Sequence, residues 1–165
     1  MNRRLLIGTI TAATLAAAFT TAPRAGREEK LLHGSYRLAK RVGASGTEVK
    51  PPDALGFLTF TETHRTVIMK WKAPDGTPVS VALIARYTLE GGKYCETVDY
   101  GVQSNLGQEG VSYDPPQDAP QCTPAVTDAS GLAFDIPSEK LRVRVTRDGI
   151  IATTPRWTDT WEKTR

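Results

Sequence analysis

The sequence predicts a single all-β domain, an antiparallel up-and-down β-barrel of about eight strands. Short runs of alternating apolar and polar residues recur along most of the chain, and turns rich in Gly and Pro separate them. No heptad pattern and no long amphipathic helix is found. A meander of hairpins leaves two open edges, and closure into a barrel removes both.

The first 25 residues have the composition of an export signal. Arg3 and Arg4 precede an uncharged apolar run over residues 5–19, and small residues follow as far as Ala25. This run is shorter than the about 20 apolar residues that cross a bilayer. We therefore expect residues 1–25 to be removed on export, leaving no stable membrane span. The arginine pair fits either the general secretory route or the twin-arginine route.

The basic character of the chain comes from this leader. Lys and Arg number 21 and Asp and Glu 18, and residues 1–25 hold Arg3, Arg4 and Arg24 but no acid. The remaining 18 basic residues equal the 18 acidic ones, so the mature chain is formally neutral. This balance gives no reason to expect nucleic acid as a partner. We expect residues 26–33 to be a polar lead-in and residues 34–165 to form the barrel domain.

The segment 55–102 reads as four strands joined by turns, and strands before and after it complete the barrel. On the strand after Thr66, Val67, Met69 and Trp71 share one face. On the strand 79–89 both faces are apolar, so the sequence leaves its inward face undecided. The predicted strands cover residues 34–42, 55–60, 66–71, 79–89, 94–102, 132–136, 141–146, 150–154 and 156–163. Residues 104–124 are the longest predicted loop, and residues 123–127 are a candidate for one further short strand.

Cys95 and Cys122 are the only cysteines. An even number of cysteines in an exported chain favours a disulfide, although two separate thiols are the alternative. The bond would join the strand 94–102 to the Pro-rich segment beyond it. In the chain-entropy model such a loop closure contributes about 3–4 kcal/mol.

Several short motifs resemble those of the bacterial lipocalin-like domain family. Residues 34–38 (GSYRL) are similar to its opening Gly-x-Trp-Arg-Leu, and residues 56–60 (GFLTF) to its Gly-x-Leu-x-Phe. Residues 87–91 (YTLEG) resemble a hairpin of the family, and residues 161–163 (WEK) its final Trp-Glu-Arg. Tyr36 and Lys163 stand where the family has Trp and Arg, which pack together at the closed end. Here we expect that contact from Tyr36 with Lys163 or Arg165, or from Trp161 instead. The resemblance implies an eight-stranded barrel around an apolar pocket.

The candidate site is the barrel lumen, with a small apolar or amphipathic molecule as its ligand. Glu96 is the single polar anchor that we expect there, because it shares a strand face with tyrosines. The alternatives for Glu96 are an ion pair with an Arg at the barrel mouth or exposure to water. The predicted ligand-binding residues are Met69, Trp71, Leu83, Tyr87, Glu96, Val98, Tyr100 and Val143.

Two other functions fit the same barrel. An enzyme of the isomerase or cyclase type would use Glu96 or Asp99 with a Tyr, and a filled barrel would act as an interaction module of the cell envelope. We assign no catalytic residue. We expect no metal and no cofactor, because His33 and His64 are the only histidines and no spacing typical of metal ligands occurs. The sequence does not determine the oligomeric state.

Overall fold

The computed structural model describes residues 25–73, 75–105 and 110–164, and its antiparallel strands confirm the all-β class. The predicted export leader lies almost wholly outside the described residues. A helix, α1 (Ala25–Leu32), precedes the strands, and a 3-10 turn, η1 (Pro137–Glu139), follows β10. The strands are β1 (Gly34–Gly43), β2 (Glu48–Val49), β3 (Ala54–Phe60), β4 (His64–Lys72), β5 (Pro78–Glu90), β6 (Lys93–Asn105), β7 (Val111–Asp114), β8 (Gln121–Pro124), β9 (Val126–Asp128), β10 (Gly131–Ile136), β11 (Leu141–Val145), β12 (Gly149–Thr153) and β13 (Trp157–Lys163).

These thirteen strands exceed the predicted number of about eight, mainly because short strands form where the sequence predicts loops. The largest difference is the segment 104–124, which contains β7 and β8. Both strands pair with β6 through their backbones. Backbone pairing leaves no alternating apolar pattern in so short and polar a segment, so the sequence does not reveal it.

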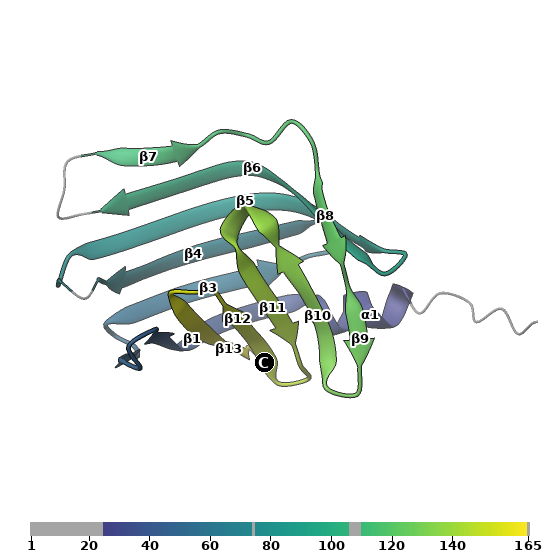
Figure 1. Ribbon diagram of the computed structural model, residues 1–165, viewed down its shortest axis with the longest axis horizontal. Coiled ribbons are helices and arrows are strands. Elements are labelled where there is room, and N and C mark those ends of the chain that lie inside the picture. Colours follow the sequence, from purple (N-terminus) through teal and green to yellow (C-terminus); the bar gives the residue numbers. More distant parts are fainter. Residues whose placement is uncertain (1–24, 74, 106–109, 165) are drawn as a thin grey trace, which may run out of the picture.

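All strands belong to one curled sheet, in the order β7-β6-β5-β4-β3-β1-β13-β12-β11-β10-β9. The first long strand, β1, lies beside the last, β13. Toward one end of this order β8 pairs with the start of β6, and at the opposite end β9, which follows β8 in the chain, pairs with β10. In Figure 1, β10–β12 cross in front of the layer formed by β4–β6. The strands β8 and β9 thus connect the two arms of the curl.

The predicted disulfide is confirmed. Cys95 and Cys122 are bonded, and they stand directly opposite each other in the β6–β8 pair. The bond therefore joins the connecting strand to β6 at one point of the curl.

The structure decides which face of β5 points inward, a question that the sequence left open. Leu83, Ala85, Tyr87 and Leu89 are buried, whereas Ile84 is 41% exposed. Helix α1 contacts both β5 and β10 and covers part of this face.

A β-bulge in β6 reverses the faces of its second half. Ala85 pairs with Val98 and Ile84 pairs with Tyr100, so Asp99 is the extra residue. One inserted residue moves every later side chain to the opposite face. Tyr100 therefore lies on the outer face and is 45% exposed. The prediction that Tyr100 lines the interior is wrong for this reason.

One end of the curled sheet is closed by α1 and Tyr36. The Tyr36 side chain is fully buried, and its hydroxyl donates to the Leu32 carbonyl at 2.7 Å. The Lys163 ammonium lies 5.6 Å from the centroid of the Tyr36 ring. Tyr36 and Lys163 thus make the contact that the family resemblance implies for Trp and Arg.

Alkaline pH is expected to destabilise the protein through Tyr36. Burial raises the pKa of the Tyr36 phenol to about 12 from 10.0. Because the folded state holds this proton more tightly than the unfolded state, the stabilisation is complete below pH 10.0 and is lost as the pH rises to about 12. Over this pH range, the wild type should lose about 2–3 kcal/mol more unfolding free energy than Tyr36→Phe does. Urea unfolding at several pH values measures the difference. Tyr113→Phe, at an exposed tyrosine, is the control. Equal losses in the Tyr36→Phe variant and the wild type would contradict the expectation.

Candidate functional site

A buried ion pair crosses the interior from β4 to β6. The Arg65 Nε donates to Glu96 Oε2 at 2.7 Å, and Arg65 Nη2 donates to Glu96 Oε1 at 2.8 Å. Both side chains are at most 3% exposed. A bidentate pair of this kind combines charge with fixed geometry. Glu96, the predicted polar anchor, is thus bound by an arginine of the same chain, in the interior rather than at the mouth.

Two further residues complete this cluster. The Tyr94 hydroxyl donates to Glu96 Oε2, and Arg65 Nη2 also donates to Glu139 of η1. Burial raises the pKa of the Tyr94 phenol well above its usual value, so Tyr94 stays a donor. Burial alone would lower the pKa of Arg65, but the carboxylates of Glu139 and Glu96 outweigh it and hold that pKa well above its usual range. Arg65 therefore forms ion pairs with two carboxylates at once.

A second buried ion pair joins β1 to β13. The Arg41 Nε and Nη2 donate to Asp159 Oδ1 and Oδ2 at 2.7 and 2.8 Å. The guanidinium lies 4.3 Å from the ring centroids of both Trp71 and Trp157, a cation–π geometry. Burial raises the pKa of Asp159, and the hydrogen bond and charge of Arg41 partly oppose this shift.

The sequence analysis did not predict that Arg65 and Arg41 face the interior, and the reason differs between the two. Arg65 follows the same alternation as Val67 and Met69, so the period-2 pattern did contain the signal that it faces inward. Arg41 faces inward because the pairing of β1 with β13 shifts by one residue between Leu38 and Lys40. No local pattern in the sequence reveals that shift.

A small cleft lies between the two ion pairs. Its volume is about 40 Å³, close to the space of a single water molecule. Glu139, Trp157 and Val67 are its partly exposed lining residues, so they mark where the cleft reaches the surface. Its buried apolar lining comprises Leu58, Phe60, Met69, Ile136, Leu141, Val143, Ile150, Ala152 and Trp161.

The predicted lumen residues are not gathered in one place. Met69 and Val143 line the cleft. Glu96 binds Arg65, which also lines it, and Trp71 lies against Arg41, the partner of the lining residue Asp159. Leu83 and Val98 form a separate cluster with Ala85.

Tyr87 lies near the closed end. Its ring stacks on Tyr94 with centroids 5.6 Å apart, and its hydroxyl donates to the Thr61 carbonyl at 2.5 Å. This hydrogen bond commits the hydroxyl to the backbone of the β3–β4 turn.

The candidate acids are not brought together. The Asp99 carboxylate accepts from Arg86 Nε at 2.9 Å, and neither side chain is buried. Glu96 lies in the interior with Arg65. Among the described residues, no group of three or more His, Cys, Asp or Glu side chains is arranged to hold a metal ion.

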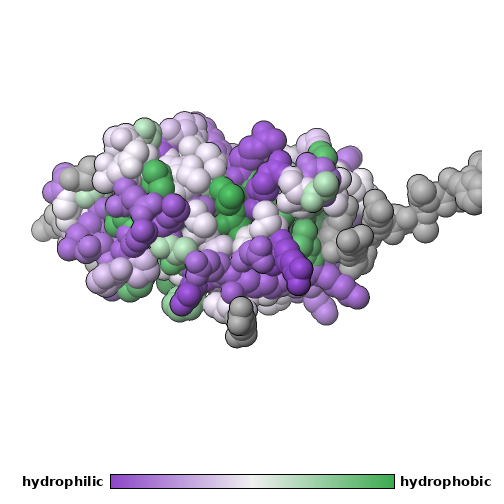
Figure 2. Space-filling view, turned by 90° about the horizontal axis from the view of Figure 1, so that it is seen from below, coloured by the Kyte–Doolittle hydropathy of each residue, from purple (hydrophilic) through white to green (hydrophobic). Residues whose placement is uncertain are grey.

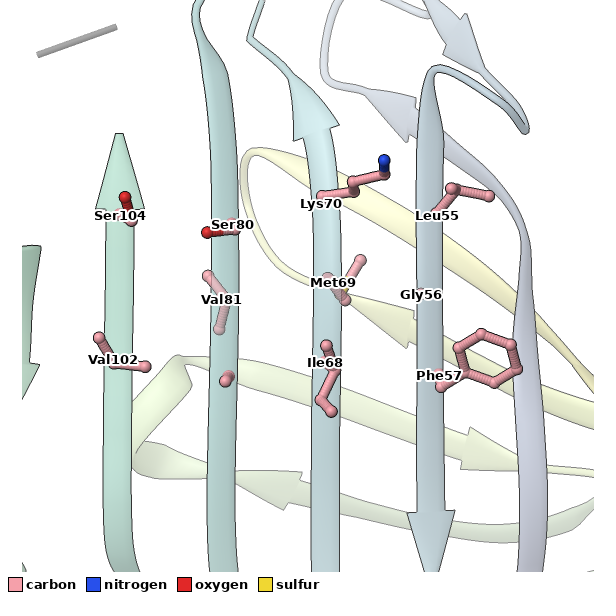
Figure 3. Close-up of a pocket in the computed structure, with 11 residues that line it drawn as sticks. Leu55, Gly56, Phe57, Ile68, Met69, Lys70, Ser80, Val81, Val102 and Ser104 are labelled. Atoms are coloured by element: carbon pink, nitrogen blue, oxygen red, sulfur yellow. The ribbon is translucent and has the colours of Figure 1, made fainter. Parts of the chain in front are cut away.

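The outer face of β3–β6 carries an apolar row. Phe57 pairs with Ile68, Ile68 with Ala82, and Ala82 with Val102. Phe57 is 64% exposed and Ile68 58%. A shallow hollow of about 370 Å³ lies on this row, with Lys70, Ser80 and Ser104 toward one end (Figure 3). The surface seen from below in Figure 2 differs, since it is mainly hydrophilic with small separate apolar groups.

The geometry defines an antiparallel curled sheet with a nearly filled interior and a small internal cleft. No family model matches the chain, and no curated protein matches it. Among solved structures, the chain is similar to a lipocalin-like protein from Bacteroides uniformis ATCC 8492, with 12% sequence identity and a TM-score of 0.39. The match covers 81% of this chain and 99% of that one. In the described part of the chain, no helix has the length and hydropathy to span a membrane.

Proposed function

We propose that this is an exported binding protein that holds a small apolar or amphipathic molecule in the interior cleft. The observation that carries the proposal is the lining of the cleft, which is apolar except at its two ends. At each end of the cleft the arginine is paired within the chain, Arg41 with Asp159 and Arg65 with Glu96 and Glu139. A buried apolar space of this kind favours apolar ligands over water.

Binding requires the cleft to widen. Its resting volume of about 40 Å³ is far below the about 300–1,000 Å³ of pockets for small molecules. The residues best placed to move are those where the cleft reaches the surface. Trp157 is half-buried, and Glu139 belongs to η1, in which no residue is buried.

The disulfide supports the exported part of the proposal. Bonds such as Cys95–Cys122 persist in oxidising compartments outside the cytosol. The basic and apolar composition of residues 1–25 points the same way.

The test is to fill the cleft and compare binding of 1-dodecanol by isothermal titration calorimetry. Ala152→Leu adds bulk to the cleft, and Ala82→Leu adds the same bulk to the outer hollow. We expect wild type and Ala82→Leu to bind dodecanol and Ala152→Leu to lose at least about tenfold in affinity. The reverse pattern would place binding on the outer face. Absence of binding to the wild type would reject the proposal.

A further inference from the structure

We propose that the cleft takes a molecule whose apolar chain ends in a carboxylate, and that Glu139 occupies the carboxylate position on Arg65 when no ligand is bound. The inference rests on the proposed function and names the class of its ligand. It follows from how the nitrogens of Arg65 are used.

The guanidinium of Arg65 has one edge fully used and one edge half used. The edge formed by Nε and Nη2 binds both carboxylate oxygens of Glu96. On the other edge, Nη2 donates to a single oxygen of Glu139, and Nη1 donates to no atom of the described residues. A carboxylate can bind such an edge through two parallel hydrogen bonds. An incoming carboxylate therefore has a better geometry available than Glu139 uses.

Of the two carboxylates on Arg65, Glu139 is the one that can leave. Glu96 is 3% exposed and also accepts from Tyr94. The Glu139 side chain is 32% exposed, and its hydrogen bond to Arg65 is its single polar side-chain contact within the described segments. Release of Glu139 into water thus costs little, whereas release of Glu96 would break a buried network.

The charge balance also selects a carboxylate. Glu96 and Glu139 together carry one more negative charge than Arg65 supplies. Exchange of the Glu139 carboxylate for that of a ligand keeps this balance unchanged in the interior. At the other end of the cleft, Arg41 has one carboxylate partner, Asp159, which is 1% exposed. An anionic group therefore has a place at Arg65 and none at Arg41.

The apolar chain of the ligand would lie in the cleft itself. Arg65 and Glu139 both line it, together with Leu58, Met69 and Val143. A carboxylate held on the free edge of Arg65 therefore places the attached chain against apolar side chains. Because Glu139 itself lines the cleft, release of its side chain from Arg65 also leaves space there.

The test compares sodium dodecanoate with 1-dodecanol, which have the same chain length but different head groups. Glu139→Gln removes the charge of the competing side chain. Glu90→Gln removes one charge from an exposed residue that forms no ion pair with the described residues. Calorimetry at pH 8 should show dodecanoate binding about tenfold tighter to Glu139→Gln than to wild type. Dodecanol affinity should be unchanged, and Glu90→Gln should behave as wild type. Glu139→Ala, which removes the competing side chain altogether, should give the same gain in dodecanoate affinity.

The outcomes separate the two proposals. If dodecanol binds but Glu139→Gln and Glu139→Ala leave dodecanoate affinity unchanged, the carboxylate inference is wrong while binding in the cleft stands. A similar gain in Glu90→Gln would also overturn the inference, because it would reflect net charge alone. If neither compound binds any variant, both proposals fail.

Discussion

Replacement of Arg65 by methionine is expected to lower the free energy of unfolding by about 3–5 kcal/mol. Arg65 is 2% exposed, and its removal leaves the carboxylate of Glu96 buried without a counter-charge. The Tyr94 hydroxyl remains as a donor to Glu96, but one neutral hydrogen bond does not replace a bidentate ion pair. The loss should be visible as a lower midpoint in urea unfolding followed by circular dichroism.

A double variant distinguishes a lost attraction from an uncompensated charge. Arg65→Met with Glu96→Leu removes both members of the pair and should recover much of the stability, because no buried charge is left alone. Arg37→Met is the control, since its partner Glu162 is 54% exposed and the pair is worth less than about 1 kcal/mol. If the single and double Arg65 variants are equally unstable, the loss comes from packing rather than from Glu96.

Replacement of Arg41 by methionine is expected to destabilise the protein in a pH-dependent way. Burial raises the pKa of Asp159, and Arg41 is the group that opposes this shift. In the variant the folded pKa of Asp159 rises further, so the folded state prefers the protonated acid. An acid with a raised folded pKa stabilises the fold below its unfolded pKa of about 3.9 and loses that contribution as the pH rises. The deficit relative to wild type should therefore be small at pH 4 and about 3–5 kcal/mol at pH 8.

The measurement is the difference in unfolding free energy between wild type and Arg41→Met at several pH values. Adding Asp159→Asn to the variant should flatten the pH dependence, because no titrating acid then remains at that position. A deficit that does not change with pH would show that the contacts of Arg41 with Trp71 and Trp157 dominate instead.

The sequence determined what depends on local patterns. Alternation identified the strands from residue 55 to 102, and the structure has β3–β6 there. The pair of cysteines in a chain with a predicted export leader led to the disulfide that the structure contains. The family resemblance left Lys163 or Arg165 as the partner of Tyr36, or Trp161 in its place, and the structure has Lys163 over the Tyr36 ring. Each of these conclusions needs only residue types and their spacing.

Tertiary structure alone decided where the charges lie and how much space remains. The bulge at Asp99 moved Tyr100 to the outer face, and the shift in β1 turned Arg41 inward. Arg65 and Glu96 are 31 residues apart, and Arg41 and Asp159 are 118 apart. A period-2 pattern cannot locate an inserted residue, and it cannot pair side chains on strands that meet only after the sheet curls. The cleft between these ion pairs depends on how side chains from β3, β4 and β10–β13 fill one shared volume, which no single strand specifies.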